Sequence, residues 1–200
     1  MNKYLTLTVD EFKYKYNIDE SNYFDSSVKI IISDESYGIV IGKDNYFCAG
    51  TLIFGATGYR ENTIIGSNNY FGPSTVIKND VFIGNNNTFD SSTYIGNLSN
   101  IQNYTKIESN SNICDHTSIG SFSHVGCLTP IYKDVKPFCK VYGNPPKINV
   151  NAITANTKKR FSSDELIAIK EYVKSDIIPD NIKIQIVIDE FTNISRKKQY

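Results

Sequence analysis

The chain has 200 residues, which is enough for one domain or for a domain with a small appendage. Its 21 Lys and Arg balance 21 Asp and Glu, so nothing in the overall charge indicates a nucleic acid or an anionic membrane as a partner. No apolar run approaches the roughly eighteen residues that span a bilayer, and the N-terminus lacks an apolar signal core. The four Cys show neither zinc-site spacing nor a disulfide framework. We therefore expect a cytoplasmic protein with no membrane insertion and no metal.

Residues 1–32 lie before a repeat that begins at Ile41. The segment from Val9 to Tyr16 is predicted to form a short helix, and the β-branched run from Val28 to Ile32 is predicted to form a strand. Because a solenoid must cover its terminal coils, we expect residues 1–32 to form an N-terminal cap.

A large apolar residue occupies every sixth position from Ile41 to Ile131, and we call these the hexad residues. The full set is Ile41, Phe47, Ile53, Tyr59, Ile65, Phe71, Ile77, Ile83, Phe89, Ile95, Ile101, Ile107, Ile113, Ile119, Val125 and Ile131. Four residues after each of them comes a small or short side chain, with Asn45, Asn69 and Asn87 as the exceptions. A six-residue period suits a short flat strand and a turn, and three such units close a triangular coil of about eighteen residues.

This spacing predicts a left-handed parallel β-helix of hexapeptide repeats over residues 33–148, with five to six coils and no long insertion. The hexad residues are expected to point inward, and residues eighteen apart are expected to stack. Phe71 should then lie over Phe89, and Ile77, Ile95, Ile113 and Ile131 should form one ladder. The pattern resembles that of the hexapeptide-repeat acyltransferase superfamily, whose members have this fold.

After Ile131, prolines stop the strand ladder, because proline cannot donate a backbone hydrogen bond. The segment Gly143 to Lys147 resembles the one that closes the last coil in many of these acyltransferases. The segment from Asn151 to Lys174 resembles the start of the C-terminal helical domain of UDP-N-acetylglucosamine acyltransferase, so residues 149–200 are expected to form a C-terminal helical extension. A capping box of Ser162 and Glu165 predicts a helix from about Ser163 to Lys174. From Ile182 to Ile188 the apolar residues alternate as in a strand, whereas the resemblance favours a helix.

The only two histidines, His116 and His124, lie in the segment Cys114 to Gly126. This segment resembles the active-site segment of the N-acyltransferase branch, in which a His and an acid precede an inward Ile or Val and a second His follows. Neutral imidazole suits the removal of a proton from an attacking amine or hydroxyl, and a backbone N–H could hold the oxyanion. The family's first His corresponds in position to Asp115, with His116 one residue later, whereas His124 matches the second His directly. Either His116 or His124 is the candidate base, and Asp115 is the candidate orienting acid.

Seven Lys and Arg against one Asp lie between Lys133 and Arg160. Such a run is commonly a solvated basic face, and its functional alternative is the binding of phosphates. The resemblance implies that Lys159 and Arg160 meet a nucleotide-sugar. It also implies that coenzyme A binds along Gly126, Lys133, Lys136 and Lys140.

Taken together, the resemblance implies a homotrimeric acetyltransferase that moves acetyl from acetyl-CoA to an amine or hydroxyl of a sugar or nucleotide-linked sugar, in surface polysaccharide or glycan synthesis. Two alternatives stay open, an acyl-carrier-protein-dependent nucleotide-sugar acyltransferase and a non-catalytic assembly subunit. A carbonic anhydrase of the same fold would need three metal-binding His, and this chain has two.

Overall fold

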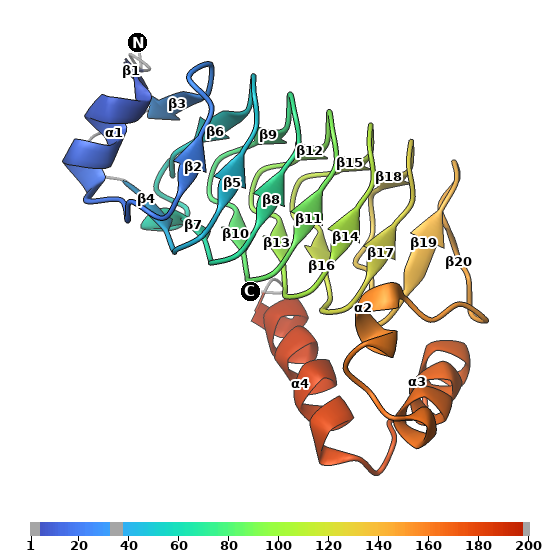
Figure 1. Cartoon of the computed structure of the whole chain (residues 1–200). Coiled ribbons are helices and arrows are strands. Elements are labelled where there is room, and N and C mark those ends of the chain that lie inside the picture. The colour runs from blue at the N-terminus through green and yellow to red at the C-terminus, as the bar shows by residue number, and fades with distance from the viewer. Residues whose placement is uncertain (1–4, 33–37, 198–200) are drawn as a thin grey trace.

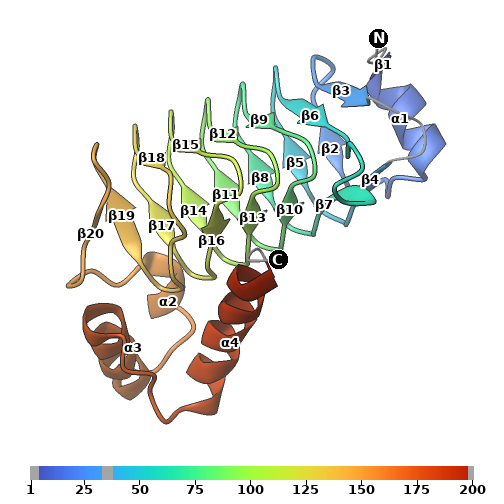
Figure 2. The same cartoon turned by 180° about the vertical axis from the view of Figure 1, so that it is seen from behind.

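The computed structural model describes residues 5–32 and 38–197. Short strands joined by turns form the three sides of a triangular prism, with helix α1 (Val9–Tyr16) at the N-terminal end (Figure 1). Three further helices lie beside the last coils at the opposite end (Figure 2).

Each side of the prism is one sheet, and successive strands of the chain step from one sheet to the next. Sheet A contains β1 (Leu5–Leu7), β3 (Lys29–Ile32), β6 (Leu52–Phe54), β9 (Val76–Ile77), β12 (Tyr94–Ile95), β15 (Asn112–Ile113) and β18 (Pro130–Ile131). Sheet B contains β2 (Tyr23–Phe24), β5 (Tyr46–Phe47), β8 (Tyr70–Phe71), β11 (Thr88–Phe89), β14 (Lys106–Ile107), β17 (His124–Val125), β19 (Lys140–Tyr142) and β20 (Lys147–Ile148). Sheet C contains β4 (Gly38–Ile41), β7 (Asn62–Ile65), β10 (Phe82–Ile83), β13 (Asn100–Ile101) and β16 (Ser118–Ile119).

The hexad residues build the core, and the predicted stacking is confirmed. Fifteen of the sixteen are buried, and the ladder from Ile77 to Ile131 pairs at intervals of eighteen residues. The rings of Phe47, Phe71 and Phe89 stack in parallel inside sheet B, with centroids 4.7 and 4.9 Å apart.

The three Asn that break the small-residue rule form a buried amide ladder. The side-chain amide of Asn69 donates to Oδ1 of Asn45 (3.0 Å), and the backbone N–H of Asn87 donates to Oδ1 of Asn69 (2.9 Å). Buried amides are stable only when their hydrogen bonds are satisfied, and stacking one coil over the next provides those partners.

The remaining hexad residue, Tyr59, contradicts the prediction that every hexad residue points inward. Its side chain is 81% exposed, and residues 55–61 form a loop between β6 and β7. Here Ile41 pairs with Ile65, 24 residues later, instead of 18. The loop is one repeat long, so the apolar spacing in the sequence continues across it, and spacing alone could not reveal it.

At the N-terminal end, α1 is confirmed at its predicted bounds. A capping box begins it, with the Thr8 side chain accepting from the backbone N–H of Glu11. The parallel ladders begin before residue 33, because β2 pairs with β5 and β3 pairs with β6.

At the C-terminal end, α2 (Ala155–Lys158), α3 (Ser163–Ser175) and α4 (Ile182–Lys197) follow the last strand. The capping box of Ser162 and Glu165 is present, and residues 182–197 are helical rather than a strand. The Phe161 ring packs edge-on against Phe122 and Phe138, at 5.3 and 5.6 Å between centroids, and this contact fixes the helices to the last coils. In the described part of the chain, no helix is both long and apolar enough to cross a membrane.

Candidate active site

The two histidines lie on different sides of the prism. His116 is in the turn between β15 and β16, at the corner where sheets A and C meet, and His124 begins β17 on sheet B. The cavities that the two residues line share no residue. Within one chain, the structure therefore does not bring these two predicted site residues together.

His116 has a left-handed backbone conformation that it shares with the equivalent turn residues of earlier coils. Its φ is +60°, and those of Leu98 and Asp80, one and two coils before it, are +57° and +58°. The positive φ at His116 therefore belongs to the turn and is not a sign of local catalytic strain.

Asp115, the predicted orienting acid, bonds to the preceding coil. Its Oδ1 accepts from the backbone N–H of Asn97 (2.8 Å) and its Oδ2 from the Asn97 side-chain amide (2.9 Å). Gly96 makes this possible, since a Cβ there would lie 2.5 Å from Asp115 Oδ1. Asp115 thus ties one turn to the next.

His124 has a carboxylate partner. Its Nε2 and Oε1 of Glu108 are 2.9 Å apart, and Oε2 of Glu108 accepts from the backbone N–H of Cys127 (3.1 Å). Because an ionised carboxylate can only accept, the bond places the proton of the neutral ring on Nε2 and leaves Nδ1 as the basic nitrogen.

The protonation states of this pair follow from its surroundings. Burial lowers the pKa of His124 below its ordinary 6.5, and the hydrogen bond to Glu108 opposes that shift in part. Burial alone would raise the pKa of Glu108, but hydrogen bonds from His124 and the Cys127 N–H hold it below its ordinary value. At neutral pH the pair is therefore a neutral imidazole beside a carboxylate, as a general base requires.

Cations surround the pair. Lys106 and Lys140 stand on either side of His124 in the register of sheet B, and the Lys106 ammonium is 3.8 Å from Oε1 of Glu108. The adjoining cavity has a volume of about 230 Å³. It is lined by Thr88, Lys106, Ser123, His124, Thr154, Ala155 and Asn156, so the C-terminal segment forms one of its walls.

The four residues predicted to bind coenzyme A, the acyl donor, are spread over the last coils. Gly126 is packed tightly, since a Cβ there would meet the Cβ of Tyr142 at 2.9 Å. The Lys136 ammonium pairs with Asp176 and lies 5.5 Å from the centre of the Tyr172 ring, so it contacts the helical segment. Lys140 is the one of the four that lies beside His124.

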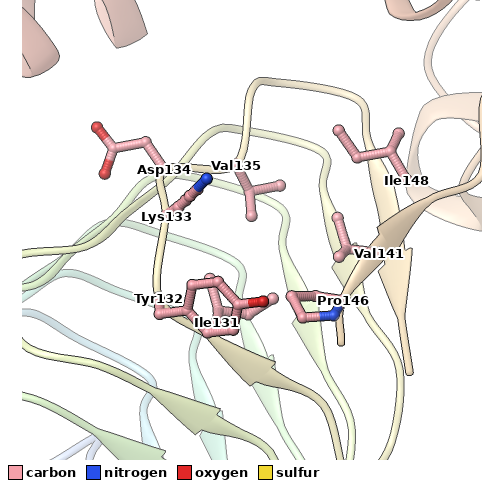
Figure 3. Close-up of a pocket in the computed structure, with 8 residues that line it drawn as sticks. All are labelled: Ile131, Tyr132, Lys133, Asp134, Val135, Val141, Pro146 and Ile148. Carbon is pink, nitrogen blue, oxygen red and sulfur yellow. The ribbon is translucent and has the colours of Figure 1, made fainter. Parts of the chain in front are cut away.

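Lys133 lines a separate cavity at the C-terminal end of the prism, with a volume of about 230 Å³ (Figure 3). The other lining residues are Ile131, Tyr132, Asp134, Val135, Val141, Pro146 and Ile148, so the walls are mainly apolar. This cavity is distinct from the one at His124, with which it shares no lining residue.

Lys159 and Arg160, the residues predicted to bind the substrate, are both exposed, and Arg160 contacts the β-helix. The Arg160 guanidinium lies 4.0 Å from the centre of the Tyr104 ring, two residues before Lys106. Asn156, which lines the His124 cavity, donates its side-chain amide to the Tyr104 carbonyl (2.9 Å). Arg160 is therefore held on the coil that carries Lys106.

The sequence analysis did not identify Glu108 as a site residue. A signal for Glu108 was present, because a stacking interval of eighteen residues places Lys106 beside His124 and Glu108 two residues further along.

No protein-family model and no curated protein matches the chain. Among solved structures, LpxA from Acinetobacter baumannii aligns with a TM-score of 0.71 and 23% identity over 80% of this chain and 69% of that one. A UDP-N-acetylglucosamine acyltransferase aligns with a TM-score of 0.68 and 21% identity over 74% of this chain and 57% of that one. The acetyltransferase domain of PglB from Neisseria gonorrhoeae FA1090 aligns with a TM-score of 0.51 and 15% identity over 60% of this chain and 57% of that one.

This chain has the left-handed β-helix fold of these acyltransferases. At such identities the likeness is one of fold, and the chain spans 69% and 57% of the first two structures. Within the described residues of this β-helix, no three His, Cys, Asp or Glu side chains are grouped to hold a metal ion.

Proposed function

We propose that this chain is an acyltransferase that moves an acyl group from a thioester donor to an amine or hydroxyl of a nucleotide-linked sugar. The observation that carries the proposal is the His124–Glu108 pair, half-buried on sheet B between two lysines. The fold supports it, because a UDP-N-acetylglucosamine acyltransferase and the acetyltransferase domain of PglB are among the solved structures that align with the chain.

In this proposal the neutral His124 takes the proton of the attacking group as that group adds to the thioester carbonyl. Glu108 fixes the ring and stabilises the imidazolium that forms. Lys106, Lys140 and Arg160 supply positive charge for the phosphates of the substrates, with Lys133, Lys136 and Lys159 as further contacts. The acyl group passes directly between the bound substrates, so no acyl-enzyme is required.

Acetyl-CoA is the donor that we propose first, and an acyl-carrier-protein thioester is the alternative. The likeness to two UDP-N-acetylglucosamine acyltransferases favours the alternative, whereas the PglB acetyltransferase domain favours acetyl-CoA.

The test is thiol release from acetyl-CoA and from an acyl-carrier-protein thioester, each with a panel of nucleotide-linked amino and hydroxy sugars. We expect release that depends on both donor and acceptor. No release with any pair, together with no coenzyme A binding by calorimetry, would contradict the proposal and favour an assembly subunit. Light scattering tests the proposed homotrimer, in which a neighbouring copy would complete the site, and a stable monomer would rule that arrangement out.

A further inference from the structure

The outward face of sheet B carries one row of side chains that leads from the N-terminal coils to His124. The strands of this sheet follow one another along the prism (Figure 1), and each member of the row pairs in register with the next. In order, the row is Tyr23, Tyr46, Tyr70, Thr88, Lys106, His124 and Lys140. The proposed chemistry uses the end of the row that holds His124, and the tyrosines at the other end have no part in it.

The three tyrosines form a stack on the surface. Ring centroids are 4.2 Å apart for Tyr23 and Tyr46 and 5.7 Å apart for Tyr46 and Tyr70, with planes 16° and 19° from parallel. The three residues are 46%, 43% and 41% exposed. The Cys48 thiol donates to the Tyr70 hydroxyl oxygen (3.3 Å), which ties the last ring to the coil before it. The Tyr70 ring is therefore oriented by its neighbours while much of it stays accessible.

The stack stops at Thr88, and this leaves a space beside Tyr70. One face of the Tyr70 ring is covered by Tyr46, and the other is turned toward the next coil, where Thr88 carries no ring. Neighbouring strands are about 4.8 Å apart, so Tyr70 and Lys106, two strands apart in register, are separated by roughly 9–10 Å. Because stacked rings have centroids about 4.5–7 Å apart, the space above Thr88 has room for one more flat ring.

The side chains around this space leave it accessible from the C-terminal segment. The Lys106 ammonium lies 3.6 Å from Oδ2 of Asp90 and 3.8 Å from Oε1 of Glu108, so it is held toward those carboxylates. Thr88 is half-buried and lines the His124 cavity, of which Asn156 forms part of another wall. Because Thr88 borders both, the space beside the tyrosine stack adjoins that cavity.

Positive charge follows one coil further along the row. Lys106 comes next after Thr88, and Arg160 is held on the same coil, 4.0 Å from the centre of the Tyr104 ring. The second cation matters because two carboxylates offset part of the charge of Lys106. His124 comes one coil later, so an aromatic face, a pair of cations and the candidate base lie in a line of about 14 Å by strand spacing.

We infer that Tyr70 and Thr88 form a nucleobase subsite, in which the base of the nucleotide-linked sugar stacks on the open face of Tyr70. The diphosphate then lies at Lys106 and Arg160, and the sugar reaches His124. A base suits the space because every nucleobase has a flat π-face, and its stacking on an aromatic side chain tolerates any base. The inference rests on the proposed function in taking the ligand to be a nucleotide-linked sugar, but base stacking requires neither His124 nor turnover.

The test is binding of UDP, GDP, inorganic pyrophosphate and coenzyme A to the full chain, by calorimetry and by saturation-transfer NMR. We expect both nucleoside diphosphates to bind more tightly than pyrophosphate and to show transfer to their base protons. Tyr70→Ala should weaken UDP binding at least about fivefold and leave pyrophosphate binding unchanged, whereas Tyr70→Phe keeps the ring and should retain UDP binding. Tyr23→Ala, which removes a ring of similar exposure from the far end of the stack, is the matched control.

Filling the space tests the same subsite from its other side. Thr88→Tyr extends the row by one ring, so it should exclude the base and weaken UDP binding as much as Tyr70→Ala does. Thr88→Ser leaves the space open and should bind UDP as the wild type does. Thermal unfolding of each variant checks that the chain is folded, so that a loss of binding reports on the subsite.

Equal binding of UDP and pyrophosphate, with no effect of Tyr70→Ala or Thr88→Tyr, would overturn the inference. Loss of coenzyme A binding in these variants, with UDP binding kept, would also overturn it, because the ring would then serve the donor. Nucleotide binding that depends on Tyr70, without thiol release from any donor and acceptor, would uphold the subsite and count against the proposed function. Thiol release with a KM for the nucleotide-sugar that Tyr70→Ala leaves unchanged would do the reverse.

Discussion

Sheet B and the corner between sheets A and C are built from the same six-residue repeat, yet each places its histidine in a different environment. On sheet B, His124 is the residue before an inward Val125, so its side chain lies in a flat row with Lys106 and Lys140 and reaches Glu108. At the corner, His116 lies in a turn, and its neighbour Asp115 bonds to the coil before it. His124 and His116 stand one and three residues before the next hexad residue, and the position of His124 is the one that brings its ring to Glu108.

The largest expected effect is on the free energy of unfolding, which should fall far more for a variant inside sheet B than for one in the corner loop (residues 55–61). Phe89→Ala removes a ring from the buried stack inside sheet B and should lower the free energy of unfolding by about 3–5 kcal/mol. Tyr59→Ala, at a hexad position of the corner loop, should change it by about 0.5 kcal/mol or less, because the ring is exposed. Urea unfolding of both variants checks this, and equal losses would mean that Tyr59 is a core residue.

Removing charge beside sheet B should weaken substrate binding. Arg160→Ala is expected to raise KM for the nucleotide-sugar about tenfold with little change in kcat, since the guanidinium lies over the Tyr104 ring, on the coil that carries Lys106, and is proposed to supply a charge-assisted contact. Lys170→Ala, on the exposed face of α3, is the control. Steady-state kinetics checks this, and a loss confined to kcat would place Arg160 outside the binding site.

Replacing the partner of His124 should move the pH profile. A base must be neutral, so activity falls as the pH drops through the His124 pKa, which lies below 6.5. Glu108 raises that pKa, so Glu108→Gln should move the acid limb to lower pH. It should also reduce kcat about tenfold, because the ring loses its orienting partner. A limb that moves to higher pH would contradict the assigned contact.

Replacing the acid beside His116 at the corner should have little effect on stability or on the pH profile. Asp115→Asn keeps an oxygen to accept from the Asn97 backbone, so we expect a stability loss of about 1 kcal/mol or less and an unchanged pH profile. Thermal unfolding and the pH dependence of kcat/KM check this prediction. A moved acid limb would show that Asp115 acts on the base after all.

Much of the fold could be predicted from the sequence because the hexad residues and the ladder obey one geometric rule. The rule gave the stacking of Phe71 on Phe89, and the capping box gave the start of α3. It could not reveal the 55–61 loop, since an insertion of one full repeat leaves Tyr59 in phase. It also marked Asn45, Asn69 and Asn87 as exceptions, although Asn69 donates to Asn45 and Asn87 donates to Asn69 once the coils are stacked.

The candidate site was less accessible from sequence for a related reason. Glu108 and His124 are sixteen residues apart and meet because neighbouring coils stack, and Asp80 reaches the loop twenty and twenty-three residues before it in the same way. The resemblance placed His116 and Asp115 together because they are adjacent in the chain. Adjacent residues at a turn need not bond to each other, and here Asp115 bonds to Asn97.

The most direct test of the central claim compares kcat for His124→Ala and His116→Ala under saturating donor and acceptor. If His124 is the general base, its loss should lower kcat by about 10²–10⁴-fold, whereas loss of His116 should leave kcat close to that of the wild type. A large fall in kcat for His116→Ala, with His124→Ala close to wild type, would contradict the account and place the chemistry at the corner.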